Sequence, residues 1–337
     1  MKAYRIKPGA GLHGLELVEL KSAPLAAHEV RVRVRAVSLN FRDLMIASGS
    51  YPLPQGFSPV AASDGAGDVV EVGSAVRDFK PGDRVVSTFF QTWTSGERPP
   101  GMANRALGGA IDGVLAEEVV LSQEGILPIP EGLDYSEAAT LPVAAVTAWT
   151  SLFVEGRAKP GDTALLLGTG GVSIWALQLA KAAGLRTVIT SSSDEKLQRA
   201  HALGADVTIN YRTHPAWEKE VLRLTRGEGA HVTVEVGGAG TLARSVEATR
   251  IGGTIALVGV LTGVAADFNP FPLLLGAKSL TGILVGSREH QTQLQRFVEV
   301  VGIKPVVDRV FGFADASAAY AHLQSGQHFG KLVIALP

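Results

Sequence analysis

Three small residues that follow an apolar run could hold a phosphate. Thr163 to Leu167 is a short uninterrupted apolar stretch, which is typical of a parallel strand covered on both faces. Gly168, Gly170 and Ser173 follow at the G-x-G-x-x-G spacing, and from Val172 apolar residues recur at helical spacing. A tight turn of this kind directs backbone N–H groups and the positive helix end at one spot. The stretch predicts a dinucleotide pyrophosphate site, with an ordinary tight turn as the alternative.

The residues about 20 positions beyond the first glycine choose between NAD and NADP, because they lie beside the adenosine ribose. Residues 190 to 193 include no acid that could bond a free 2′-hydroxyl. Ser191 and Ser192 can donate to a 2′-phosphate instead, Lys196 follows one helical turn later, and Tyr211 ends the next predicted strand. We therefore predict NADPH as the cofactor. A solvated, serine-capped helix start is the alternative, and both can hold together.

The composition excludes several classes of protein and of site. The chain has 337 residues, 46% apolar content and a formal net charge of −1, so about two globular domains and no nucleic-acid or membrane surface are expected. It has no cysteine, which excludes disulfides, thiolate nucleophiles and thiolate metal ligands. The amino terminus lacks an apolar signal core and no segment reaches roughly 18 uninterrupted apolar residues. We expect a cytoplasmic protein.

Two kinds of periodicity position these residues. Residues 1 to about 140 contain valine-rich strands between glycine and proline turns, as at 30–37, 67–73, 84–88 and 115–121, which predicts a β-rich, barrel-like domain. Residues 89 to 113 form a long loop with Trp93, either a pocket wall or a surface excursion.

After Pro142, predicted strands at 163–167, 187–190, 207–209, 232–236, 254–258 and 280–285 alternate with predicted helices at 172–183, 194–203, 215–224 and 240–250. This alternation predicts a doubly wound parallel sheet. The final residues, with a helix near 289–301 and a strand at 332–336, are expected to return to the first domain.

Several motifs together carry a resemblance to a known family. They are Ser38-Leu39-Asn40-Phe41-Arg42-Asp43, residues 64–73 (DGAGDVVEVG), residues 80–85 (KPGDRV), Leu141-Pro142 with Thr147, and Gly168 to Ser173. Along its whole length the chain resembles the medium-chain dehydrogenase/reductase superfamily, and most of all the zinc-free branch of quinone oxidoreductases and enoyl reductases. The resemblance implies a GroES-like β-barrel catalytic domain (1–142 and 287–337) and a Rossmann-type domain with a six-stranded sheet (143–286).

The resemblance also bears on metal chemistry. In zinc alcohol dehydrogenases of this superfamily two cysteines and a histidine hold the catalytic metal, and the matching positions here are Asn40, Ser63 and Val143. An amide, a hydroxyl and an alkyl group do not form a usual zinc site, so no metal is expected. Without a Lewis acid an isolated carbonyl is a poor substrate. A quinone or the double bond of an α,β-unsaturated carbonyl is better, since the charge that develops on oxygen needs only hydrogen-bond donors.

Site roles follow from the same resemblance. Asn40 is expected beside the nicotinamide carboxamide or the substrate carbonyl, with helix capping as the alternative. Tyr51 is the candidate proton donor, and a packed turn tyrosine is the alternative. Lys331 is expected at the cofactor phosphate, with a surface lysine as the alternative. Arg42 and Asp43 are expected to form a structural ion pair, with support of the neighbouring site residues as the alternative. The predicted cofactor contacts also include Thr147, Gly168, Thr169, Gly170, Gly171, Val172, Gly237, Val258, Gly259, Val260, Val285 and Gly286.

The sequence therefore favours an NADPH-dependent, metal-independent reductase of quinones or enones. An alcohol dehydrogenase of the same superfamily and a non-catalytic NADPH-binding structural or sensor protein are the alternatives. The resemblance further implies a homodimer that pairs through the sixth strands, near Leu280 to Val285.

Overall fold

The computed structural model describes residues 1–54, 56–265 and 268–337, and it divides into two compact units. Unit 1 comprises Met1–Val146 and Gly286–Pro337, and unit 2 comprises Thr147–Val285. Both boundaries lie close to those that the sequence suggested. Each unit has a large sheet of its own.

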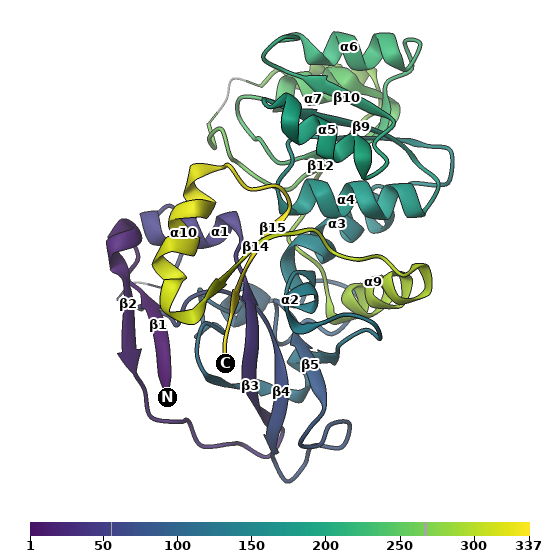
Figure 1. The fold of residues 1–337 in the computed structure, drawn as a ribbon. Helices are drawn as coiled ribbons and strands as arrows, with labels where there is room; N and C mark the ends of the chain where they lie inside the picture. Colours follow the sequence, from purple (N-terminus) through teal and green to yellow (C-terminus); the bar gives the residue numbers. More distant parts are fainter. Residues whose placement is uncertain (55, 266–267) are drawn as a thin grey trace. The chain divides into compact units, whose positions relative to one another are not determined.

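Unit 2 is built on a six-stranded parallel sheet (Figure 1). Its strands are β8 (Thr163–Leu166), β9 (Arg186–Ser191), β10 (Val207–Asn210), β11 (Ala230–Glu235), β12 (Thr249–Leu257) and β13 (Ser279–Gly282). Their order is β10-β9-β8-β11-β12-β13, and every neighbouring pair is parallel. The chain starts in the middle of the sheet, winds to one edge and returns to wind to the other. The predicted doubly wound sheet is therefore confirmed, with its topological switch point between β8 and β11.

Five helices connect these strands within the described residues: α4 (Gly171–Ala182), α5 (Asp194–Ala202), α6 (Trp217–Leu224), α7 (Leu242–Ala248) and α8 (Phe271–Leu275). Of these, α8 was not predicted. The sixth strand ends at Gly282, so its predicted extension to residue 285 is wrong. The physical reason is that Val285 has a φ of 52°, which a strand cannot accommodate.

Unit 1 contains a larger, mostly antiparallel sheet of order β14-β15-β3-β4-β5-β7, with β6 also paired to β3. Its strands are β3 (Glu29–Ser38), β4 (Asp64–Val72), β5 (Arg84–Ser87), β6 (Glu118–Ser122), β7 (Ile126–Pro128), β14 (Val307–Gly312) and β15 (Lys331–Ala335), and β1 (Lys2–Ile6) pairs with β2 (Leu15–Glu19). β15 runs antiparallel to β3, which confirms that the C-terminal segment completes the first domain (Figure 1). Helices α1 (Phe41–Ser48), α2 (Tyr135–Ala138), α9 (Arg288–Val301) and α10 (Ala316–Ser325) belong to this unit.

Alternation along β3 sets the core of unit 1. Val30, Val32 and Val34 are buried, while Arg31 and Arg35 on the other face bond carboxylates, as the period of two predicts. In the long loop, Trp93 is 4% exposed and packs edge-on against His290. The backbone carbonyl of Trp93 also accepts a hydrogen bond from the N–H of Arg288. The loop is therefore anchored to the start of α9.

One helical segment, Tyr135–Val154, is long and apolar enough to cross a membrane by length and composition alone. It combines α2, α3 (Val146–Trp149) and two π-helical turns, η4 (Leu141–Ala145) and η5 (Thr150–Val154). In its most apolar window 72% of the residues are buried inside the structure. A core helix passes the same test, so the segment is weak support for membrane insertion.

Candidate functional site

The glycine turn of unit 2 has the geometry of a phosphate site. β8 leads to Gly168, whose φ of 74° favours glycine, and α4 begins at Gly171 after an extended N-cap residue, Gly170. A Cβ built on Gly168 or Gly170 would meet nothing within 4 Å, so the backbone is open to a ligand there. Ser173 is buried and its Oγ donates to the carbonyl of Leu167 at 2.6 Å. This bond fastens the helix to the strand at the third position of the glycine pattern.

The ends of β9 and β10 lie side by side. Tyr211 N donates to the carbonyl of Ser191 at 3.0 Å, and the Oγ of Ser191 accepts from Ser193 N. Ser193 caps α5 by accepting from Lys196 N at 3.3 Å, so the predicted capping interpretation is correct. Tyr211 is 41% exposed. The serines, the first turn of α5 and the phenol thus surround the point where an adenosine ribose is expected, and β9 ends in a serine rather than an acid.

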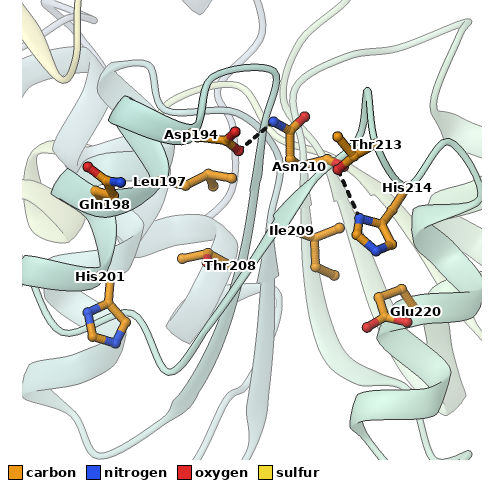
Figure 2. A pocket seen from close by; sticks show the side chains of 10 residues that line it. All are labelled: Asp194, Leu197, Gln198, His201, Thr208, Ile209, Asn210, Thr213, His214 and Glu220. Carbon is orange, nitrogen blue, oxygen red and sulfur yellow. Dashed lines mark hydrogen bonds between the residues drawn. The ribbon is translucent and has the colours of Figure 1, made fainter.

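A separate hollow of about 450 Å³ lies beside this region, between α5 and the edge strand β10 (Figure 2). His201 lies on one side of it and His214 on the other, where Thr213 shares a hydrogen bond with His214. At its top Asn210 Nδ2 donates to Asp194 Oδ1 at 2.6 Å. The predicted cofactor residues, all of which the structure describes, do not line this hollow. No motif in the sequence signalled it, and its groups are not convergent enough to suggest chemistry.

The end of β11 is organised by a residue that sequence reasoning missed. Glu235 is fully buried, and its carboxylate accepts from the N–H groups of Gly237 (2.6 Å) and Gly238 (3.0 Å) and from the hydroxyls of Thr241 and Ser245. Four donors replace the water that such a carboxylate loses on burial. The only signal in the sequence is an acid at the end of an apolar strand, followed by two glycines.

Backbone geometry also marks the other predicted contacts in unit 2. Val258 N and Gly259 N both donate to the carbonyl of Glu235, so the ends of β11 and β12 are fixed to each other. Val285, a β-branched residue, is held at a φ of 52°, a conformation that costs on the order of 1–3 kcal/mol and tends to occur at ligand sites. Thr147 is 3% exposed and lies in α3, between the two π-helical turns, a feature that is frequent at functional positions.

The predicted cofactor residues of unit 2 lie at one edge of its sheet, the edge formed by the carboxyl ends of the strands. Gly168, Thr169, Gly170, Gly171 and Val172 follow β8, Ser191, Ser192 and Lys196 follow or end β9, Tyr211 follows β10, Gly237 follows β11, and Val258, Gly259 and Val260 follow β12. The carboxyl ends of parallel strands meet at the same edge of the sheet, where open α/β sheets bind ligands. Gly286, which is buried, begins the C-terminal part of unit 1.

Unit 1 contributes a buried polar cluster around Asn40. Lys331 is 3% exposed, and its Nζ donates to Asn40 Oδ1 at 2.6 Å and to the carbonyl of Leu39 at 2.5 Å. The ammonium was expected to contact the cofactor phosphate, but it bonds these two protein oxygens. The pairing of β15 with β3 places it beside Asn40. Asn40 occupies the N-cap position of α1, and Asp43 Oδ2 accepts from its backbone N–H at 2.8 Å.

The carboxylates of this cluster are perturbed by burial. Asp64 accepts from Ser63 Oγ at 2.6 Å and from Val143 N at 3.1 Å. Burial raises the pKa of Asp64, against the lowering effect of Lys331, and raises the pKa of Asp43 to about 6, against that of Arg42. Burial lowers the pKa of Lys331, while both carboxylates oppose that change.

Tyr51 lies in the same unit and contacts the cluster through Arg42. The Arg42 guanidinium lies 4.8 Å from the centroid of the Tyr51 ring and 4.9 Å from that of Phe89. Its Nη1 lies 3.9 Å from Asp43 Oδ1, which confirms the predicted ion pair. No hydrogen bond joins Tyr51 to Asn40 among residues 1–54, 56–265 and 268–337. The structure thus brings Asn40 and Lys331 together directly, and it links Tyr51 through Arg42 to Asp43, which bonds Asn40.

Comparison with known proteins gives matches along the chain. Two family profiles match, "Alcohol dehydrogenase GroES-like domain" at residues 26–131 and "Zinc-binding dehydrogenase" at residues 171–301. The zinc-type alcohol dehydrogenase-like protein C1773.06c of Schizosaccharomyces pombe is 42% identical over 313 residues, which cover 91% of this chain and 90% of that protein. A quinone oxidoreductase of Pseudomonas aeruginosa is 31% identical, with 95% of both chains covered. A phenolphthiocerol/phthiocerol polyketide synthase of Mycobacterium tuberculosis is 32% identical over 98% of this chain but only 14% of its own.

The similar solved structures also include alcohol dehydrogenases and a quinone oxidoreductase. A putative alcohol dehydrogenase from Sinorhizobium meliloti 1021 superposes with a TM-score of 0.92 at 41% identity, covering 99% of this chain and 98% of that one. An NAD-dependent alcohol dehydrogenase superposes with a TM-score of 0.90 at 35% identity, with both chains fully covered. The Escherichia coli quinone oxidoreductase complexed with NADPH superposes with a TM-score of 0.84 at 25% identity, covering 99% of this chain and all of that one.

Proposed function

The chain belongs to the medium-chain dehydrogenase/reductase superfamily, and from that premise we propose that it is an NADPH-dependent reductase of quinones or of the C=C bond of α,β-unsaturated carbonyls. It is an oxidoreductase of this family by its relatives, which include both alcohol dehydrogenases and quinone oxidoreductases. The observation that carries the choice between them is the Lys331 ammonium bonded to the Asn40 amide.

That observation bears on zinc. The positions that match zinc ligands hold an amide, a hydroxyl and an alkyl side chain, at Asn40, Ser63 and Val143. Ser63 donates to Asp64, and Val143 enters the cluster through its backbone N–H. A buried ammonium already bonds the Asn40 oxygen, and it would repel a divalent cation bound there. These residues do not fit a nitrogen and sulfur zinc site.

The nucleotide half fits NADPH. Backbone N–H groups of the Gly168 to Val172 turn would hold the pyrophosphate, because α4 is twelve residues long and its N-terminus follows two open glycines. Ser191, Ser192 and Lys196 would hold a 2′-phosphate. The E. coli quinone oxidoreductase complexed with NADPH supports the choice of NADPH, whereas the similar NAD-dependent alcohol dehydrogenase favours NAD as the cofactor. When bound, the reduced nicotinamide supplies the hydride.

The residues of unit 1 then act on the substrate oxygen and carbon. Asn40 offers an amide N–H to the oxygen on which negative charge develops, an interaction worth on the order of 3 kcal/mol in a dry site. The Tyr51 hydroxyl makes no hydrogen bond to another described residue, so it can donate a proton to the enolate carbon. A quinone needs no carbon protonation. Asn40 therefore serves both substrate types, and Tyr51 serves the enone.

The experiment is a substrate panel. The purified protein is incubated with NADPH and, in turn, with 1,4-benzoquinone, a small 2-enone and a saturated ketone, and nicotinamide absorbance is followed. We expect turnover of the first two and little of the third. Oxidation of an alcohol with NAD⁺ or NADP⁺, abolished by a chelator, would instead establish the alcohol dehydrogenase. NADPH binding without any turnover would establish a non-catalytic binding protein.

We also propose that the protein forms a homodimer through β13. This strand is an edge of the six-stranded sheet, and the surface around it carries exposed apolar side chains, Ile251, Phe271, Leu274, Leu275 and Leu280. An unpaired edge strand next to exposed apolar groups favours pairing with a second copy. Light scattering that gives the mass of one chain would contradict the proposal.

A further inference from the structure

Lys331 makes contacts that a surface lysine or a phosphate ligand would not make. It is the first residue of β15, and Leu39 N donates to the carbonyl of Leu332 at 3.0 Å, so the strand pairing fixes its backbone beside residue 40. Its Nζ has two protein acceptors, the Leu39 carbonyl and Asn40 Oδ1. Burying a lysine costs several kcal/mol unless its charge is compensated. A buried lysine therefore needs hydrogen-bond acceptors or negative charges around its ammonium group.

The bond to Lys331 fixes which way the Asn40 amide faces. An ammonium has three donors and no acceptor, so only the amide oxygen can bond it. The Nδ2 group must then point away from Lys331. It is buried and meets no acceptor at full hydrogen-bond geometry within residues 1–54, 56–265 and 268–337, although the Asp64 carboxyl lies close enough to be affected by it. Leaving a buried donor unsatisfied costs about 1–3 kcal/mol, and such a group calls for an explanation.

The charged groups around the amide are Lys331, Asp64, Asp43 and Arg42. Asp43 accepts from the backbone N–H of Asn40, and the Asn40 side chain, as a hydrogen-bond donor, lowers the pKa of Asp64. Because Nδ2 carries two N–H bonds, one can face Asp64 while the other faces the substrate. Both oxygens of Asp64 already accept from Ser63 and Val143. A positive charge at the amide oxygen also polarises the group, which makes its N–H a stronger donor.

We propose that Lys331 is a positioning residue that holds the Asn40 amide with its N–H₂ group toward the substrate oxygen. This inference rests on the proposed function, since it names the residue that prepares Asn40 to stabilise the developing oxyanion. It also gives this chain, whose positions 40, 63 and 143 lack zinc-ligand side chains, a fixed positive charge on the oxygen side of the Asn40 amide. A freely rotating amide would present its oxygen about half of the time and would then repel that charge.

Two substitutions separate the parts of this arrangement. Asn40→Asp keeps the shape and an oxygen for Lys331 but removes the N–H donor, whereas Lys331→Met keeps the donor and releases the amide. Lys331→Arg retains a cation and tests rescue. Lys80→Met, at a lysine side chain that is 80% exposed, is the matched control and should leave turnover unchanged. Thermal unfolding of every variant checks that the fold is retained.

The expected result is a loss of turnover, measured with NADPH and 1,4-benzoquinone. Asn40→Asp should lower kcat about 10²- to 10³-fold, with the Kd for NADPH changed by less than about threefold. Lys331→Met should lower kcat by a smaller factor, and Lys331→Arg should recover most of it. The double variant should equal Asn40→Asp alone, because a residue that acts only through Asn40 has nothing left to act on.

A binding measurement supplies a readout besides activity. With NADP⁺ present, 4-nitrophenolate mimics an oxyanion product, and its absorbance reports binding. Its affinity should fall in both single variants and should fall no further in the double variant. Losses that multiply in the double variant, or an unchanged kcat and phenolate affinity in Asn40→Asp, would overturn the proposal. A fall in NADPH affinity alone would overturn it too, since Nδ2 would then bond the nicotinamide carboxamide.

The two proposals fail separately. If the wild-type protein reduces neither quinone nor enone, the proposed function is wrong, and the phenolate measurements still decide whether Lys331 orients Asn40. If the wild-type protein is active and the variants match it, the orientation is wrong and the function stands.

Discussion

Replacing Asp43 by Asn should change how stability depends on pH. Asp43 is 2% exposed, and burial raises the pKa of its carboxyl from 3.8 to about 6. Its Oδ2 accepts from the backbone N–H of Asn40, and an Asn side chain can keep that bond through its own oxygen. The variant therefore removes the titration while keeping the helix cap.

The sign follows from proton binding. The folded state holds this proton more tightly than the unfolded state, so Asp43 contributes stability that is complete below pH 3.8 and is lost as the pH rises through about 6. A difference of about 2 pKa units corresponds to about 3 kcal/mol of unfolding free energy. At pH 4, close to the unfolded pKa of 3.8, the folded protein still has most of this stabilisation. The wild-type protein should therefore lose about 2–3 kcal/mol relative to Asp43→Asn between pH 4 and pH 7.5. Arg42 attracts only the ionised carboxylate, so its effect is already contained in the folded-state pKa of Asp43 and adds no separate contribution.

Urea unfolding of both proteins at several pH values between 4 and 7.5 provides the assay. The difference in unfolding free energy is plotted against pH, and Asp83→Asn serves as the control. The pKa of Asp83 is lowered, chiefly by its hydrogen bond to Lys80, so its difference should have the opposite sign of slope. A flat difference for Asp43→Asn, or one in which the wild type gains with rising pH, would refute the reasoning.

Three further changes test the proposed function and assembly. Ser191→Asp places a carboxylate where a 2′-phosphate is expected and should lower the kcat/KM for NADPH by about 10- to 100-fold relative to NADH; a variant that still strongly prefers NADPH would contradict the assignment. Tyr51→Phe should slow enone reduction about 10²-fold and quinone reduction much less, and equal losses would remove Tyr51 from the mechanism. Leu274→Glu charges an exposed apolar residue beside β13 and should halve the mass seen by light scattering, whereas an unchanged dimer would exclude this edge.

The nucleotide half was largely predictable because its signals are local. The glycine turn, the strands of unit 2 and most of its helices follow from short apolar runs and from a period of 3.6 residues within short windows. The exception shows the limit. The sixth strand, which ends at Gly282, cannot include residue 285 because Val285 has a positive φ, and nothing about a valine in the sequence signals such strain.

Lys331 shows the opposite case. Its contact with Asn40 joins residues 291 positions apart and depends on the antiparallel pairing of β15 with β3. No window of sequence contains both partners, and lysine is the residue type least expected in a core. A role at the cofactor phosphate was therefore the natural prediction from its place in the motif. Glu235 was missed for a related reason, since its donors come from a loop and a helix whose positions follow from the sheet.

Charge balance explains why so many ionisable groups can share the interior of unit 1. Arg42 and Lys331 carry two positive charges and Asp43 and Asp64 two negative ones, so the cluster is neutral when all four are ionised. Removing Lys331 leaves an uncompensated buried charge and costs about 3–5 kcal/mol. A fall in activity of Lys331→Met alone could thus arise from a disturbed cluster. Adding Asp64→Asn restores neutrality without restoring the bond to Asn40. Turnover should stay low in that neutral variant if Lys331 acts by positioning Asn40, and it should recover if the charge balance alone is at fault.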